Sequence, residues 1–210
     1  MSRMGIIVNV DECIGCHACF IACKQENQVS PNIQWNRIRK VENREKNIIN
    51  YFRASCQHCE DPACLKVCPM KAVYKGPHGE ILIDQDKCIA CKACLAACPY
   101  GMPMFNDRKL TSYYGEKQPL FSPSNPPTKN AQPGKAEHCT LCSHRLAKGK
   151  EPACVEICPA KALTLVDFDA PTKKQKKLLS KAVQLKAGVD TKPKVRYICS
   201  NMDFREVALK

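Results

Sequence analysis

Short apolar runs separated by turn-forming residues predict several brief strands and helices rather than a few long ones. Ile6–Val10 predicts a strand that leads into a cysteine-rich loop, and Ala18–Gln25 predicts the helix that follows. Ala72–Tyr74 and Glu80–Ile83 flank a segment of glycine and proline, which is typical of a hairpin. A further strand is predicted at Ala162–Val166. This mixture of short elements favours the α+β class.

Two segments depart from this pattern. Residues 106–133 are rich in proline and predict an irregular insertion, either a surface loop or a loop that contacts a partner. Residues 171–210 start with a basic run that predicts a helix from Lys173 through Lys186, and they close with a predicted strand at Val195–Cys199. The lysines of this helix fit a solvated face better than a binding site.

The apolar content is low for a chain of 210 residues, which has six Phe, six Tyr, six Met and one Trp. We therefore expect something other than a hydrocarbon core to stabilise the fold. No apolar run approaches the ~18 residues needed to span a bilayer, and the apolar segment near the N-terminus is too short for a signal peptide. These features predict a soluble chain without an export signal of its own.

Seventeen cysteines supply the strongest signal in the sequence, because sixteen of them form four groups of four, here called tetrads. The first and third tetrads share the spacing Cys-x2-Cys-x2-Cys-x3-Cys, the second has four residues in its middle gap, and the fourth has eleven. Three of the four tetrads end in Cys-Pro. In chain order the members are Cys13, Cys16, Cys19 and Cys23; Cys56, Cys59, Cys64 and Cys68; Cys88, Cys91, Cys94 and Cys98; and Cys139, Cys142, Cys154 and Cys158.

This spacing is typical of [4Fe–4S] clusters, because a short loop wraps three thiolates around one cubane and a fourth cysteine follows one helical turn later. Structural zinc is the main alternative, but it takes two Cys-x2-Cys pairs with a longer spacer, whereas three tetrads are compact. A disulfide scaffold would not repeat one pattern of four, and no cysteine lies in the context of a catalytic nucleophile. The sequence therefore predicts four [4Fe–4S] clusters.

The formal charge of +13 suggests nucleic-acid binding at first sight. Sixteen cluster thiolates would add sixteen negative charges, and four oxidised cores of about +2 each would return eight, so the loaded chain carries about +5. The sequence also contains no nucleic-acid-binding motif. A solvated or partner-facing basic surface is the better explanation of the charge that remains.

Three further residues lie near or outside the tetrads. His17 and His58 fall between tetrad cysteines but are supernumerary as ligands, so we expect loop residues that tune cluster potentials through nearby contacts. Cys199 belongs to no tetrad. It is expected to be a buried small hydrophobic residue at the end of a strand rather than a ligand or a redox group.

In the order of its tetrads the chain resembles the iron–sulfur subunits of the dimethyl-sulfoxide-reductase family of molybdopterin oxidoreductases. The resemblance covers nearly the whole length, including residues 14–16, 59–64, 139–142 and 191–198. Its length and tail are most similar to those of subunits that serve arsenic- or sulfur-oxyanion reductases, with arsenate, thiosulfate, polysulfide or tetrathionate as the terminal substrate.

The resemblance implies that tetrads exchange their last cysteines in pairs, the first with the fourth and the second with the third. The fold would then contain two ferredoxin-like two-cluster units, residues 1–54 with 134–170 and residues 55–105. The implied ligand sets are Cys13, Cys16, Cys19 and Cys158; Cys139, Cys142, Cys154 and Cys23; Cys56, Cys59, Cys64 and Cys98; and Cys88, Cys91, Cys94 and Cys68.

The resemblance also implies an electron-transfer subunit rather than an enzyme, relaying single electrons in anaerobic respiration. The first and fourth tetrads would face a molybdopterin catalytic subunit, and the second and third would face a membrane quinone subunit, a cytochrome or another redox partner. Export of the folded chain with a signal-bearing partner would place it outside the cytoplasm, with a cytoplasmic, membrane-associated site as the alternative. A subunit of a hydrogenase or formate dehydrogenase, and a free polyferredoxin, are the other functions that fit.

Overall fold

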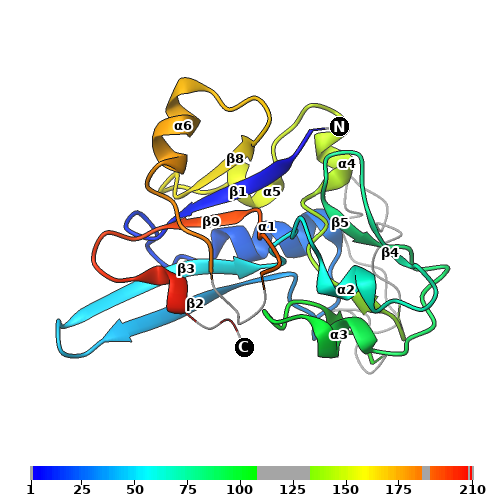
Figure 1. Ribbon diagram of the computed structural model, residues 1–210. Coiled ribbons are helices and arrows are strands. Elements are labelled where there is room, and N and C mark those ends of the chain that lie inside the picture. Colours follow the sequence, from blue (N-terminus) through cyan, green and yellow to red (C-terminus); the bar gives the residue numbers. More distant parts are fainter. Residues whose placement is uncertain (1, 108–132, 186–189, 208, 210) are drawn as a thin grey trace, which may run out of the picture.

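A computed structural model describes residues 2–107, 133–185, 190–207 and 209 of the chain, apart from the side chain of residue 206. Most of the expected insertion at residues 106–133 lies outside these ranges. The described elements are short (Figure 1). In chain order they are β1 Met4–Asn9, α1 Ala18–Asn27, β2 Asn36–Asn43, β3 Ile48–Ser55, α2 Ala63–Lys66, β4 Val73–Lys75, β5 Ile81–Ile83, α3 Ala93–Ala97, β6 Met104–Phe105, β7 Ala136–Glu137, α4 Ser143–Leu146, α5 Ala153–Glu156, β8 Leu163–Asp167, α6 Lys173–Leu179, β9 Val195–Ile198 and the 3-10 turn η1 Phe204–Glu206.

The three-stranded sheet has the order β8-β1-β9, so segments from both ends of the chain lie side by side. Strand β1 is the middle strand, and its residues Ile6, Ile7 and Val8 are buried. It pairs antiparallel with β8 and parallel with β9. All three strands were predicted, within two residues at each end. Since β1 precedes the first tetrad and β8 follows the fourth, this sheet brings those two tetrads together.

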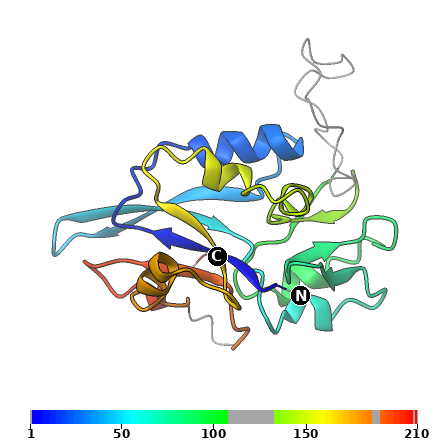
Figure 2. The same cartoon turned by 90° about the horizontal axis from the view of Figure 1, so that it is seen from above.

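Strands β2 and β3 form an antiparallel hairpin of eight residues on each side, which the sequence did not predict. The tip of the hairpin extends away from the rest of the molecule in both ribbon views (Figures 1 and 2). The other end of β3 is buried, from Phe52 through Ser55. Polar residues dominate β2, so its sequence carries little of the apolar alternation that identifies a strand.

The predicted hairpin in the second tetrad region is confirmed as strands β4 and β5. Helix α2 contacts helix α3 beside it. These four elements group on one side of the molecule, separate from the three-stranded sheet (Figures 1 and 2). The helix predicted at Ala18–Gln25 is also confirmed, as α1, which contacts α5.

The tail helix predicted through Lys186 is wrong, because α6 ends at Leu179. Its start is well defined by a capping box between Thr172 and Gln175. The chain then turns, and Val183 exchanges two backbone hydrogen bonds of 2.8 and 2.9 Å with Tyr197. Pairing with β9 therefore replaces the last turns of the expected helix. Beyond this bridge the backbone of Thr191 and Lys192 accepts hydrogen bonds from the second tetrad loop, which ties the tail to both halves of the chain.

Cysteines form a large part of the packed interior. The main core cluster joins eight buried cysteines to aliphatic residues and to a group of three aromatic rings. In that group Phe52 packs edge-on against Phe204, with ring centroids 4.7 Å apart, and Tyr197 stacks on Phe204 at 5.0 Å. Within the described ranges, no helix has the length and apolar character needed to cross a membrane.

Candidate iron–sulfur centres

Four hollows, each lined by four cysteines, lie inside the described part of the chain. Together with the open space at its mouth, each hollow measures about 260 to about 360 Å³. Among the described residues the cysteines do not converge on one point as they would around a single metal ion, but stand around a space. The hollows are named here site A (Cys13, Cys16, Cys19, Cys158), site B (Cys139, Cys142, Cys154, Cys23), site C (Cys56, Cys59, Cys64, Cys98) and site D (Cys88, Cys91, Cys94, Cys68).

Each hollow combines three cysteines of one tetrad with the last cysteine of another. For sites A and B the pairing follows from the β1–β8 ladder and from the contact between α1, which carries Cys19 and Cys23, and α5, which carries Cys154. For sites C and D it follows from the contact of α2 with α3, which carry Cys64 and Cys94. Four soft sulfur ligands around such a space are the donor set of a [4Fe–4S] cluster.

A left-handed residue precedes the second cysteine of every tetrad. The four residues are Gly15, His58, Ala90 and Leu141, with φ between 44° and 69°. This conformation curls the loop, and the backbone N–H groups of His58 and Leu141 each donate to the sulfur of the cysteine two residues earlier at 3.4 Å. Such N–H···S bonds favour a negative sulfur and are one of the means by which proteins tune cluster potentials.

Gly15 has a second reason to be glycine, because a β-carbon there would lie 2.7 Å from Cγ of the Tyr51 ring. We expect Gly15→Ala to cost about 1–2 kcal/mol for its positive φ and about 1–3 kcal/mol more for displacing that ring. Gly149 is the matched control, since its φ of 67° is similar but nothing lies within 4 Å of a β-carbon. Anaerobic chemical denaturation of both variants tests the difference, and equal losses of stability would contradict the role of Tyr51.

Shared or adjacent residues link the sites in the order A, B, C, D: Arg53 lines both A and B, His138 of site C precedes Cys139 of site B, and α2 contacts α3 between C and D. Burial raises the pKa of Cys19 in site A to about 12, and charge on Cys154 of site B raises it too. Burial also raises the pKa of Cys56 in site C well above its usual range, with a contribution from Cys139 of site B. In the same way burial raises the pKa of Cys64 in site C to about 12, with a contribution from Cys94 of site D.

These raised pKa values mean that the free thiols would hold their protons at neutral pH. Binding of iron reverses this, because a metal-bound thiol gives up its proton. Bound iron would supply the positive charge that the buried sulfur needs in place of its proton. The hollows are therefore suited to thiolate only when iron is bound.

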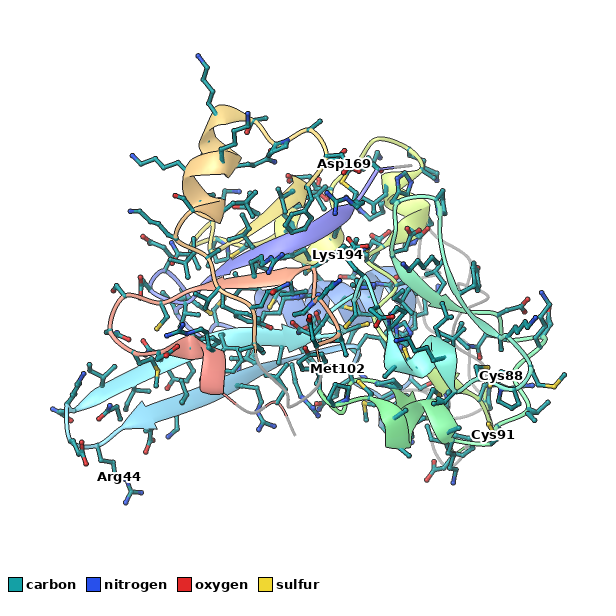
Figure 3. All side chains as sticks on the ribbon, in the orientation of Figure 1. Arg44, Cys88, Cys91, Met102, Asp169 and Lys194 are labelled. Atoms are coloured by element: carbon teal, nitrogen blue, oxygen red, sulfur yellow. The ribbon has the colours of Figure 1, made fainter. Side chains whose placement is uncertain are left out.

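Exposed cysteines occur only at the two ends of this order, since of the sixteen tetrad members Cys16 in site A and Cys91 in site D are exposed. Figure 3 shows Cys88 and Cys91 at one end of the molecule, far from Arg44 at the tip of the β2–β3 hairpin. Large apolar side chains are also exposed near both ends. They are Ile14, Ile21 and Ile157 on the chain segments around site A, and Val67, Met70 and Ile89 on those around site D.

Arg53 is the functional candidate that the sequence did not reveal. It lies on β3 and lines both site A and site B. Burial alone would lower the pKa of its guanidinium, but negative charge on the thiolate forms of Cys154, Cys139 and other nearby cysteines raises it above the usual value. Arg53 is therefore a permanent buried cation. Only the unpredicted β2–β3 hairpin brings it to this position.

The two loop histidines differ from each other in the structure. His17 is exposed and lines site A. His58 is buried, and its Nδ1 accepts a hydrogen bond from the backbone N–H of Ile81 at 3.0 Å. His58 contacts the tetrad cysteine Cys56 through its backbone N–H rather than through its ring.

Cys199 follows β9, as expected, but it is only partly buried. Its thiol donates a hydrogen bond of 3.2 Å to Asn201 Oδ1, so a polar contact replaces the purely apolar packing that was expected.

Family comparisons agree with the four hollows. Models of the 4Fe-4S dicluster domain match residues 48–113 and 119–168, and residues 12–72. The chain is 36% identical to the arsenate respiratory reductase iron-sulfur subunit of Shewanella sp. (strain ANA-3), over 94% of this chain and 97% of that protein. It is 33% identical to the B subunit of anaerobic dimethyl sulfoxide reductase from Escherichia coli (strain K12), covering 92% and 87%, and 35% identical to the B subunit of polysulfide reductase from Wolinella succinogenes, covering 92% of each.

The fold and the cysteine sites define an iron–sulfur protein with two dicluster domains, which fit four [4Fe–4S] clusters. The chain thus belongs to the iron–sulfur electron-transfer subunits of the molybdopterin oxidoreductase family. Its relatives are subunits of reductase complexes, which agrees with a role in electron transfer rather than in transforming a substrate.

Proposed function

We propose that sites A, B, C and D each hold one [4Fe–4S] cluster on the four cysteines that line them, and that the chain relays single electrons along this order. The observation that carries the proposal is the row of four hollows with an exposed cysteine only at each end. When bound, such a cluster accepts and releases one electron at a time. All four cysteines of site B and three of the four in site C are buried, whereas sites A and D each present an exposed cysteine to a partner.

The chain is proposed to consist of two ferredoxin-like two-cluster units, residues 1–54 with 134–170 and residues 55–105. The β1–β8 ladder and the α1–α5 contact support the first unit. The α2–α3 contact and the β4–β5 hairpin support the second. In this arrangement residues 106–133 are an insertion between the units, and residues 171–210 form the tail.

We propose that site A faces a molybdopterin catalytic subunit and that site D faces a membrane quinone subunit, a cytochrome or another redox partner. The exposed apolar residues near each end support two separate docking faces, because large apolar side chains in clusters favour protein interfaces. The near full-length match to the arsenate respiratory reductase subunit supports an arsenic- or sulfur-oxyanion reductase as the complex. We place this complex outside the cytoplasm, where export with a signal-bearing partner would take it.

Charged substitutions at the two ends test these docking faces. Ile14, 64% exposed, lies beside site A, and Ile89, 57% exposed, lies beside site D. We expect Ile14→Glu to weaken co-purification with the catalytic subunit by about tenfold or more, because it places a charge inside an apolar interface. Ile89→Glu should leave that interaction intact and weaken the contact with the other redox partner.

Ile49→Glu is the matched control, since Ile49 is 56% exposed on the β2–β3 hairpin and lines none of the four sites. Binding constants measured with the purified partner subunit compare the three variants. Equal weakening by Ile14→Glu and Ile89→Glu would contradict two distinct faces. Full activity of the chain as a free carrier, with no partner retained, would favour a polyferredoxin.

A further inference from the structure

Arg53 is a buried cation between two cluster sites. Its side chain lines both site A and site B, and the residue is 1% exposed. Nη1 donates a hydrogen bond of 2.7 Å to Ser55 Oγ, and Nη2 donates one of 3.6 Å to Cys139 Sγ. The Nε–H group is buried and has no hydrogen-bond partner in the described part of the chain. The Nε–H donor therefore remains available for a further acceptor in this space.

The counter-charge of Arg53 comes from cysteine rather than from carboxylate. The described ion pairs of arginine involve Arg3, Arg44, Arg145 and Arg205, and none joins Arg53 to an acidic residue. The charges that act on Arg53 most strongly are those of the thiolate forms of Cys154, Cys139, Cys19 and Cys23. Cys19 belongs to site A and the others to site B.

Burying an unpaired guanidinium costs several kcal/mol, because the charge loses its hydration. A site that also holds an anionic cluster offsets this cost, and the offset grows when the cluster gains an electron. The cation thus favours the reduced state of whichever cluster it faces, and this interaction is strong because little water screens it.

The buried cation near site C differs from Arg53 in its surroundings. Lys194 is also buried, but its Nζ donates to the carbonyl of Gly79. The carboxylates of Glu60 and Glu80 act on it as well. Its charge is therefore shared with acidic residues, whereas the charge of Arg53 faces sulfur.

We propose that Arg53 is a potential-setting residue whose fixed positive charge, shared between sites A and B, raises the reduction potentials of those two clusters together. This inference rests on the proposed ligation of sites A and B. It implies that electrons are held preferentially in the A–B half of the chain. Arg53 acts only through its fixed charge on the two clusters, since it neither gains nor loses an electron itself.

The experiment compares Arg53→Gln, Arg53→Lys and the surface control Arg44→Gln. Each loaded complex is titrated anaerobically with a reductant, and electron paramagnetic resonance measures the reduced fraction of each cluster. Arg44 lies at the exposed tip of the same hairpin (Figure 3), so its loss removes one charge far from the hollows. We expect Arg53→Gln to lower two of the four midpoint potentials, Arg53→Lys to lower them less, and Arg44→Gln to leave all four unchanged. The clusters are assigned to sites with variants that remove one ligand each.

Three results would overturn the role of Arg53: no shift in Arg53→Gln, an equal shift of all four clusters, or equal shifts in the Gln and Lys variants. If Arg53→Gln does not retain its clusters, Arg53→Lys distinguishes a role of the charge from a role in packing, because it keeps the charge and changes the shape of the side chain. Loss of the same clusters in Arg53→Lys would assign Arg53 to packing instead. The wild-type protein tests the proposed ligation separately, since fewer than four clusters there would count against the ligation and not against Arg53.

Discussion

Replacing Cys98 with alanine is expected to disrupt the cluster of site C, although Cys98 belongs to the third tetrad. The other members of that tetrad line site D, whereas Cys98 lines site C with Cys56, Cys59 and Cys64. Removing it leaves three thiolates around that cluster. We expect loss of about a quarter of the bound iron and sulfide, or conversion of this one cluster to a three-iron form.

Anaerobic iron and sulfide analysis, combined with electron paramagnetic resonance, measures this outcome. Cys68→Ala is the reciprocal variant, and it should damage site D although Cys68 belongs to the second tetrad. Cys199→Ala is the control, because Cys199 lines none of the four hollows and should leave all clusters in place. Damage to site D in Cys98→Ala, with site C intact, would contradict the exchange.

Removal of iron and sulfide from the whole chain is expected to abolish cooperative folding. The main core cluster contains eight buried cysteines, so much of the interior is organised around the hollows. Without iron and sulfide the cysteines of distant segments would no longer be joined through a shared cluster, and folding that depends on a bound metal is lost with the metal.

Circular dichroism during anaerobic thermal unfolding tests this expectation by comparing the loaded chain with chain treated with chelator and oxidant. The loaded chain should unfold in one cooperative transition, and the treated chain should show none. Reconstitution with iron and sulfide should restore it, which serves as the control for irreversible damage. An unchanged melting temperature after complete iron removal would show that the hydrocarbon core stabilises the fold by itself.

The cysteine sites were largely predictable because the chemistry requires sulfur at short, repeated spacings. The spacing alone identified all sixteen residues that line the hollows. It did not decide which tetrads exchange a cysteine, because that depends on contacts between distant segments such as β1 and β8. The family resemblance implied the pairing, and the hollows are lined by the same groups of cysteines.

The β2–β3 hairpin and Arg53 could not be predicted from local pattern. An arginine is usually solvent-exposed, and no nearby residue in the sequence indicates that Arg53 is buried between cysteines. Similarly, Ala90 and Leu141 adopt the left-handed conformation without being glycine, so the residue type carries no signal. The predicted helix was longer than α6 for a related reason, because the bridge from Val183 to Tyr197 that replaces its end is a tertiary contact.

The central claim is a linear path of four clusters with exchanged ligands. Anaerobic crystallography of the loaded complex, with iron located from its anomalous scattering, tests it most directly. The expected result is four clusters in the order A, B, C, D, each held by three cysteines of one tetrad and the last cysteine of its paired tetrad. A cluster held by all four cysteines of a single tetrad, or a path that places site D beside site A, would contradict the account.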